Sequence, residues 1–173
     1  MTEKQIFENI TKEAERIEED TEFSAKRHFN AADFWLHIHY FIGIPMTALA
    51  AIGGIKAFGA HPEWAGYLAI GAAVLGALQT FVNPEEKASK HKVFGGQYLT
   101  LRNDARLFRS IELPADAVPD AREKIIQLSK RRNDLNESAP NTPACAHKKA
   151  KCDIEDGFSK YHTDKEPAKG ERK

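Results

Sequence analysis

Few residues in this chain combine a reactive side chain with a spacing that could do chemistry. His37 and His39 lie two positions apart, which places them about 200° apart on a regular helix, so they cannot hold one metal ion together. Four further candidate ligands have a spacing that fits no common zinc pattern: Cys145, His147, Cys152 and His162. The sequence has no glycine-rich phosphate loop and no nucleophile elbow. We therefore predict a protein that is not an enzyme, with no catalytic residue, no metal site and no cofactor.

The elements that carry these residues are dominated by two apolar runs, residues 34–58 and 64–82. Apart from Lys56, the runs contain no Asp, Glu, Lys or Arg. As helices they would reach roughly 37 Å and 29 Å, and a membrane-spanning helix needs roughly 20 apolar residues. The five residues between them leave room only for a turn. The pattern predicts an all-α protein built on a two-helix transmembrane hairpin. A soluble protein with two core helices is the disfavoured alternative, because 173 residues offer little to wrap around them.

Charge is segregated around these runs and divides the chain into four parts. Residues 1–33 carry a net charge of −4 and residues 84–173 a net charge of +4. We expect a cytosolic amphipathic helix with a basic juxtamembrane segment at 1–33, the hairpin at 34–82, a cytosolic helical region at 84–136, and a polar, partly disordered tail at 137–173. Basic residues near the ends of membrane spans favour the cytosol, and they gather on the side of the two termini. The expected location is therefore the inner membrane, with both termini cytosolic.

Local signals set the expected helix boundaries. Thr2 can cap a helix over 3–20, and Asn30 can cap a separate first span. Pro45 is expected to kink that span, and Asn83 precedes Pro84 at the start of a helix over about 84–111. Along this last helix the apolar positions step by 4, 3, 4 and 3, a coiled-coil rhythm, at Phe94, Tyr98, Leu101, Ala105 and Phe108.

The second run holds rows of small residues that would let helices approach closely in lipid. The predicted seam for helix packing or oligomerisation consists of Ala65, Ala69, Ala72, Ala73, Gly76, Ala77 and Thr80. Thr47, Gln79 and Thr80 are candidates to line a pore, and equally candidates for ordinary hydrogen bonds between helices. His37 and His39 are expected near the cytosolic interface, with pH sensing or pore lining as the other interpretations.

Two membrane helices cannot enclose a water path. Conduction would therefore need a homo-oligomer, with the stripe from Phe94 to Phe108 as a plausible means of assembly. Lys130, Arg131 and Arg132 form a short basic patch, which suits anionic lipid better than nucleic acid. We expect the lipid bilayer as a partner and no nucleic acid.

The layout resembles the SLATT family, which comprises bacterial two-span proteins associated with SMODS nucleotidyltransferases and SLOG sensor domains. The resemblance covers roughly residues 10–162. Besides the paired spans, it is carried by Ala25-Lys26-Arg27-His28-Phe29, by Asn83-Pro84-Glu85-Glu86-Lys87-Ala88 with His91, by Gln97-Tyr98-Leu99-Thr100-Leu101-Arg102-Asn103-Asp104, and by Ala139-Pro140-Asn141-Thr142-Pro143 ahead of Ile154, Gly157 and Tyr161.

What the resemblance implies is a membrane effector of a bacterial conflict or antiphage system. Such proteins are expected to oligomerise, form a pore and depolarise the inner membrane on activation. A nucleotidyltransferase- or SLOG-type sensor encoded nearby would supply the trigger, because the chain itself contains no such domain. The alternative functions are a passive membrane anchor that recruits a cytosolic partner through the C-terminal helices, and a small transporter or channel subunit with a housekeeping task.

Overall fold

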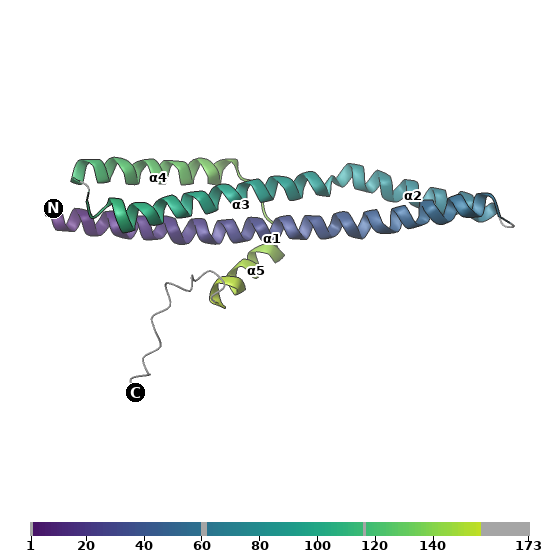
Figure 1. The fold of residues 1–173 in the computed structure, drawn as a ribbon, viewed down its shortest axis with the longest axis horizontal. Helices are drawn as coiled ribbons and strands as arrows, with labels where there is room; N and C mark the ends of the chain where they lie inside the picture. Colours follow the sequence, from purple (N-terminus) through teal and green to yellow (C-terminus); the bar gives the residue numbers. More distant parts are fainter. Residues whose placement is uncertain (1, 60–61, 116, 157–173) are drawn as a thin grey trace, which may run out of the picture.

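The computed structural model describes residues 2–59, 62–115 and 117–156, and every element within these ranges is helical (Figure 1). The predicted all-α class is therefore confirmed. The elements are α1 (Glu3–Ala57), α2 (Glu63–Val82), α3 (Pro84–Leu107), a π-helical turn η1 (Phe108–Glu112), α4 (Val118–Ser138) and α5 (Ala144–Glu155).

Helix α1 is a single helix of 55 residues, and the predicted break between an N-terminal helix and a first span is wrong. Thr2 caps it as expected, in a capping box with Gln5. Asn30 caps nothing: it lies inside α1, and its Nδ2 donates to Asp153 Oδ2 of α5 at 3.0 Å. The helix continues because residues 20–42 contain no glycine or proline to end it. It also runs unbroken through Pro45, and the kink there stays a prediction.

The N-terminal half of α1 forms a bundle with α3 and α4, while α5 packs against α1 away from α4 (Figure 1). The apolar stripe of α1 buries Ile10, Ala14 and Ile17 against α3 and α4. The rest of this core consists of Leu101, Ala105, Phe108, Leu113, Ala121, Ile125 and Leu128. Its members come from all three helices, so the bundle has one continuous core.

The predicted coiled-coil stripe is therefore occupied within the chain. Tyr98, Leu101 and Ala105 are fully buried, Phe108 is 1% exposed, and Phe94 stacks on His28. Because these side chains already pack inside one chain, they are not free to join subunits. The prediction that this stripe joins subunits is therefore wrong.

Ion pairs between helices explain the segregation of charge. Carboxylates of α1 face guanidinium groups of α3 and α4 and of the π-helical turn. Arg109 lies 3.1 Å from Glu18, Arg102 3.2 Å from Glu22, and Arg132 3.3 Å from Asp20. Arg131 also has a partner, Asp104 of α3, at 2.6 Å. The basic patch at 130–132 thus has two of its three charges engaged within the bundle, which weakens the prediction that it serves anionic lipid.

The predicted tail contains a further element. Helix α5 lies within residues 137–173 and is held to α1 by Asn30 and by Lys26, whose Nζ donates to the Asp153 carbonyl at 3.4 Å. Residues 144–155 of the predicted tail are thus a helix that packs against α1 through Ala146 and Ala150. Gly157 and Tyr161, which belong to the family resemblance, and the end of the chain lie outside the described residues.

Beyond the bundle, α2 packs on the C-terminal half of α1 and forms an arm, defined here as residues 34–57 together with α2 (Figure 1). Both helices are long and apolar enough to cross a membrane, and within their most apolar windows only 6% and 0% of the residues are buried. Core helices of a soluble protein would be covered. Both apolar helices of the arm are instead exposed, which argues against a soluble protein with two core helices.

Asn83 joins the arm to the bundle. It is the one non-glycine residue with positive φ (45°) among residues 2–59, 62–115 and 117–156, a conformation that asparagine tolerates better than most residues. Asn83 stands before Pro84 as predicted, but its side chain does not cap the backbone of α3. Its amide bonds Glu86 instead.

Close packing of α1 on α3 depends on one glycine of an adjacent pair. A Cβ at Gly95 would lie 2.9–3.1 Å from three ring carbons of Phe29, whereas a Cβ at Gly96 would meet nothing within 4 Å. The sequence shows only a helix weakened by two glycines. The structure shows that Gly95 makes room for an aromatic ring.

We predict opposite effects for alanine at these two positions. Gly95→Ala should lose stability because overpacking costs about 1–3 kcal/mol, whereas Gly96→Ala should gain about 1 kcal/mol from helix propensity. Denaturant titration of the full chain in detergent, followed by circular dichroism, measures the difference. Equal effects for the two variants would mean that Phe29 does not pack on Gly95.

Candidate functional site

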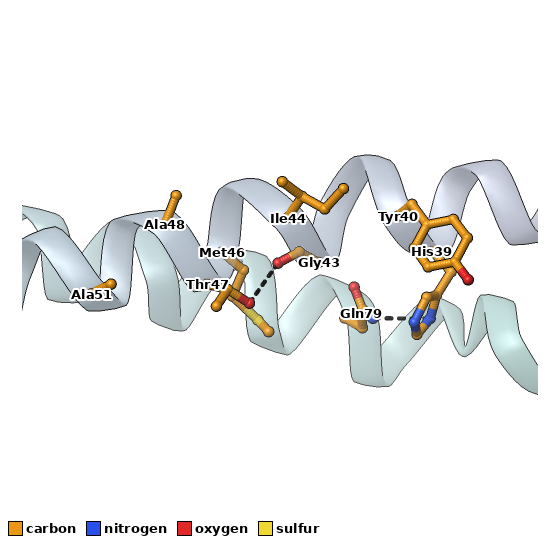
Figure 2. Close-up of a pocket in the computed structure, with 9 residues that line it drawn as sticks. All are labelled: His39, Tyr40, Gly43, Ile44, Met46, Thr47, Ala48, Ala51 and Gln79. Carbon is orange, nitrogen blue, oxygen red and sulfur yellow. Dashed lines mark hydrogen bonds between the residues drawn. The ribbon is translucent and has the colours of Figure 1, made fainter.

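A groove of about 500 Å³ runs along the arm between α1 and α2. It is a candidate site because polar side chains gather there on an otherwise apolar surface. Its lining residues are His39, Tyr40, Gly43, Ile44, Met46, Thr47, Ala48, Ala51 and Gln79 (Figure 2). Eight of these nine belong to α1, and Gln79 reaches into the groove from α2.

One hydrogen bond between the two helices lies at the His39 end of the groove (Figure 2). Gln79 Nε2 donates to His39 Nδ1 at 3.1 Å (Figure 2), which places the hydrogen of the neutral imidazole on Nε2. Gln79 Oε1 is buried and accepts no hydrogen bond from the residues that the structure describes. A buried amide oxygen without a donor is costly, by about 1–3 kcal/mol. The groove thus lacks one hydrogen-bond donor, the one that would bond Gln79 Oε1.

The structure brings two of the three predicted pore-lining residues together. Thr47 and Gln79 share the groove, whereas Thr80 is exposed and is not part of its lining. Both hydroxyls bond within their own helix, Thr47 to the Gly43 carbonyl at 2.9 Å and Thr80 to the Gly76 carbonyl at 3.0 Å. Gln79 is therefore the residue of the three that links the helices.

The two histidines of the first run have different surroundings. His37 is exposed, and its Nδ1 bonds the Asp33 carbonyl of its own helix at 2.6 Å. His39 is half-buried and faces Gln79. The sequence predicted a position near the interface for both histidines but did not predict the hydrogen bond between His39 and Gln79. The spacing of His39, Gly43, Met46 and Gly53, by 4, 3 and 7 residues, is typical of one helix face and could have revealed it.

The predicted seam of small residues divides between two faces of α2. Ala65, Ala72 and Gly76 are half-buried against α1. The outward-facing members are Ala69, Ala73, Ala77 and Thr80. A row with four-residue spacing turns by about 40° at each step, so one row cannot stay against a single partner. Only part of the seam serves the contact between α1 and α2, and the rest is open to a further helix.

Glycines allow α1 and α2 to approach each other closely within the arm. The predicted seam included Gly76 of α2 but not Gly53 of α1. A Cβ at Gly53 would lie 3.3 Å from Leu68 Cβ and 3.6 Å from the Ala65 carbonyl oxygen. From the other side, a Cβ at Gly76 would lie 3.3 Å from Met46 Sδ. Glycine on both helices thus sets the spacing at which Gln79 can reach His39.

The other candidate ligands do not converge. Cys145 and Cys152 are exposed on α5, and His147 packs edge-on against Phe23, with ring centroids 5.0 Å apart. His162 lies outside the described residues. Within the described ranges, no group of three or more His, Cys, Asp or Glu side chains could hold a metal ion.

No family model, no curated protein and no solved structure matches this chain.

Packing within the arm should respond to only one of two neighbouring glycines. We expect Gly53→Leu to push α1 away from α2, at a cost of about 1–3 kcal/mol, and Gly54→Leu to be tolerated because a Cβ there meets nothing within 4 Å. Hydrogen exchange of the full chain in micelles, read over residues 46–57 and 63–72, measures the loosening. Faster exchange in both variants, or in neither, would contradict the packing described.

Proposed function

We propose that this protein is a membrane effector of a bacterial defence system, which oligomerises through its arm and forms a pore that depolarises the inner membrane. The observation that carries the proposal is the groove with its incomplete hydrogen bonding at Gln79, on an arm that the chain itself leaves uncovered. The defence role comes from the resemblance to the SLATT family. It rests on the residues quoted for that resemblance.

Lipid around the arm is supported by its aromatic ends. Trp35 lies at the base of the arm beneath Lys87, whose Nζ is 4.4 Å from the ring centroid. Trp64 and Tyr67 contact each other at the far end, with centroids 6.3 Å apart. Aromatic belts at both interfaces and basic residues on the cytosolic side are typical of membrane spans. This pattern favours the bundle and both termini in the cytosol.

Oligomerisation is supported by two polar groups of the groove that lipid cannot hydrogen-bond. Hydrocarbon offers no donor to Gln79 Oε1 and no polar surroundings for His39, and unsatisfied polar groups in a bilayer cost several kcal/mol. A second copy can satisfy them across the open groove. The outward-facing row from Ala69 to Thr80 would let that copy approach closely. Because two helices cannot enclose water, the assembly needs several copies.

Activation is expected to come from outside the chain. A nucleotidyltransferase- or SLOG-type sensor system is the partner that the family resemblance implies. The bundle of α1, α3 and α4 would receive its signal, since α1 passes from bundle to arm without a break. The alternative, a passive anchor, uses the same bundle to recruit a partner and needs no pore.

Substitutions at neighbouring polar positions distinguish these functions. Gln79→Leu should reduce assembly, because each copy loses an interhelical hydrogen bond of about 0.6–1.7 kcal/mol and the loss is multiplied over the copies. Thr80→Val is the matched control, since that hydroxyl bonds its own helix. The measurements are dye leakage and collapse of the membrane potential in liposomes that hold the purified protein, with crosslinking to count the copies.

The proposed pore predicts leakage with the wild type and Thr80→Val and at least tenfold less with Gln79→Leu. If the wild type never leaks, even with the cognate sensor active, the effector role is wrong and the anchor role gains. Equal leakage from all three proteins would place the pore elsewhere than the groove.

A further inference from the structure

A pair of buried histidines joins α1 to α3 just outside the arm. His28 Nδ1 lies 3.0 Å from His91 Nδ1, and the two side chains are 0% and 3% exposed. His28 precedes the first apolar run by six residues, about 9 Å along the helix. The pair therefore connects the helices near the point where bundle becomes arm.

Aromatic rings hold His28 in place from the other helix. Its ring stacks on Tyr98 with centroids 5.4 Å apart and on Phe94 at 5.9 Å. Tyr98 is itself fixed, because its hydroxyl donates to Asn136 Oδ1 of α4 at 2.8 Å. Neither imidazole can move away from the other without disturbing this packing.

The hydrogen bond within the pair exists only in certain protonation states. One Nδ1 must donate and the other must accept, so at most one Nδ1 carries a hydrogen. His28 Nε2 is buried without a partner among the described residues. An orphaned lone pair is easier to tolerate there than an orphaned N–H, which favours His28 as the donor and His91 as the acceptor. A second proton on His91 Nδ1 would replace the bond with two N–H groups pointing at each other.

Among residues 2–59, 62–115 and 117–156, no carboxylate bonds either imidazole, whereas the positive charge of Arg27 acts on both. Arg27 lies on α1, and on α3 the titratable neighbour is Tyr98. One turn further on α3, Arg102 is neutralised by Glu22 at 3.2 Å. Asp153 of α5 is bound to Lys26 and Asn30. The surroundings thus favour neutral histidines.

We propose that the His28–His91 pair is a proton-operated clasp, closed when both imidazoles are neutral and opened when the pair takes up protons that its buried, closed geometry excludes. The protons come from the cytosolic solution, and the charged rings separate α1 from α3 at the base of the arm. That this separation opens the arm toward its conducting state rests on the proposed function. The clasp itself does not depend on it.

Burial lowers the pKa of His28 from 6.5 to about 4, with His91 and then Arg27 adding to the effect. Burial, followed by Arg27, also lowers the pKa of His91. Above pH 6.5 the imidazoles are neutral whether the clasp is closed or open, so its stability is complete. As the pH falls from 6.5 toward 4, the open form takes up protons that the closed form refuses, and stability is lost.

The test follows hydrogen exchange of the full chain in nanodiscs, corrected for the intrinsic pH dependence of exchange. Between pH 7.5 and pH 5, protection factors over residues 24–32 and 88–98 should fall by about 30-fold from His28 alone. The double variant His28→Asn, His91→Asn keeps an amide hydrogen bond at the Nδ1 positions and cannot be charged, so its protection should stay within about threefold. His147→Asn, an exposed histidine on α5, is the matched control and should behave as the wild type.

An equal fall in the wild type and the double variant would overturn the clasp. If the double variant fails to fold, the wild type decides through ¹⁵N spectra of its histidine rings: His28 neutral at pH 5 supports the proposal, and titration near 6.5 overturns it. Liposome leakage separates this result from the proposed function. Leakage at no pH refutes the pore alone, whereas leakage that rises on acidification equally in both proteins refutes the clasp alone.

Discussion

The antiparallel contact between α1 and α3 is the interaction on which the other elements depend. A helix of 55 residues is held straight over its N-terminal half by the core around Ile17 and Leu101, by ion pairs such as Arg109–Glu18, and by the fit of Phe29 over Gly95. Burial of apolar side chains supplies most of the stability. The ion pairs contribute less, because several of their side chains are partly exposed. They join the acidic face of α1 to guanidinium groups of α3, of the π-helical turn and of α4.

Most of the helices could be predicted from local signals, and their boundaries failed where tertiary contacts decide. The two apolar runs can be recognised from composition, and the start of α3 from Pro84 after Asn83. The continuity of α1 could not be predicted, because Asn30 is locally typical of a helix start and lies just before the change from polar to apolar sequence. A cap residue forms a cap only where the backbone breaks, and nothing between residues 20 and 42 breaks it. Asn30 instead serves a contact to a residue 123 positions away, which no local pattern contains.

The candidate site was predicted in part, for a related reason. Polar residues within an apolar run are conspicuous, so Thr47 and Gln79 could be found in the sequence. Their partners depend on how the two helices are rotated about their axes, and that rotation is set by Gly53 and Gly76 at the closest points of approach. The partnership of His39 with Gln79 and the exclusion of Thr80 both follow from it. His28 and His91 were each among the residues that carry the family resemblance, but their contact could not be predicted. They lie 63 positions apart, and only the register of α1 against α3 brings them together.

The arrangement of these contacts along α1 has a mechanical consequence. The core of the bundle, the histidine pair, the Lys87–Trp35 contact and the groove follow one another along a single unbroken helix. A change in how α1 sits against α3 at His28 cannot be absorbed by a hinge before Trp35, because the helix has no glycine or proline there. The change in packing would instead tilt or rotate the arm, or would alter the backbone at Asn83. Asn83 is the one residue with left-handed backbone conformation between α2 and α3 in the described part of the chain. Gly43 and Pro45 begin the first stretch of α1 where the backbone can yield, and this is also where the groove opens. Gln79 Oε1 and His39, which lack further polar partners among the described residues, therefore lie in the part of the arm that a displacement of α1 would move.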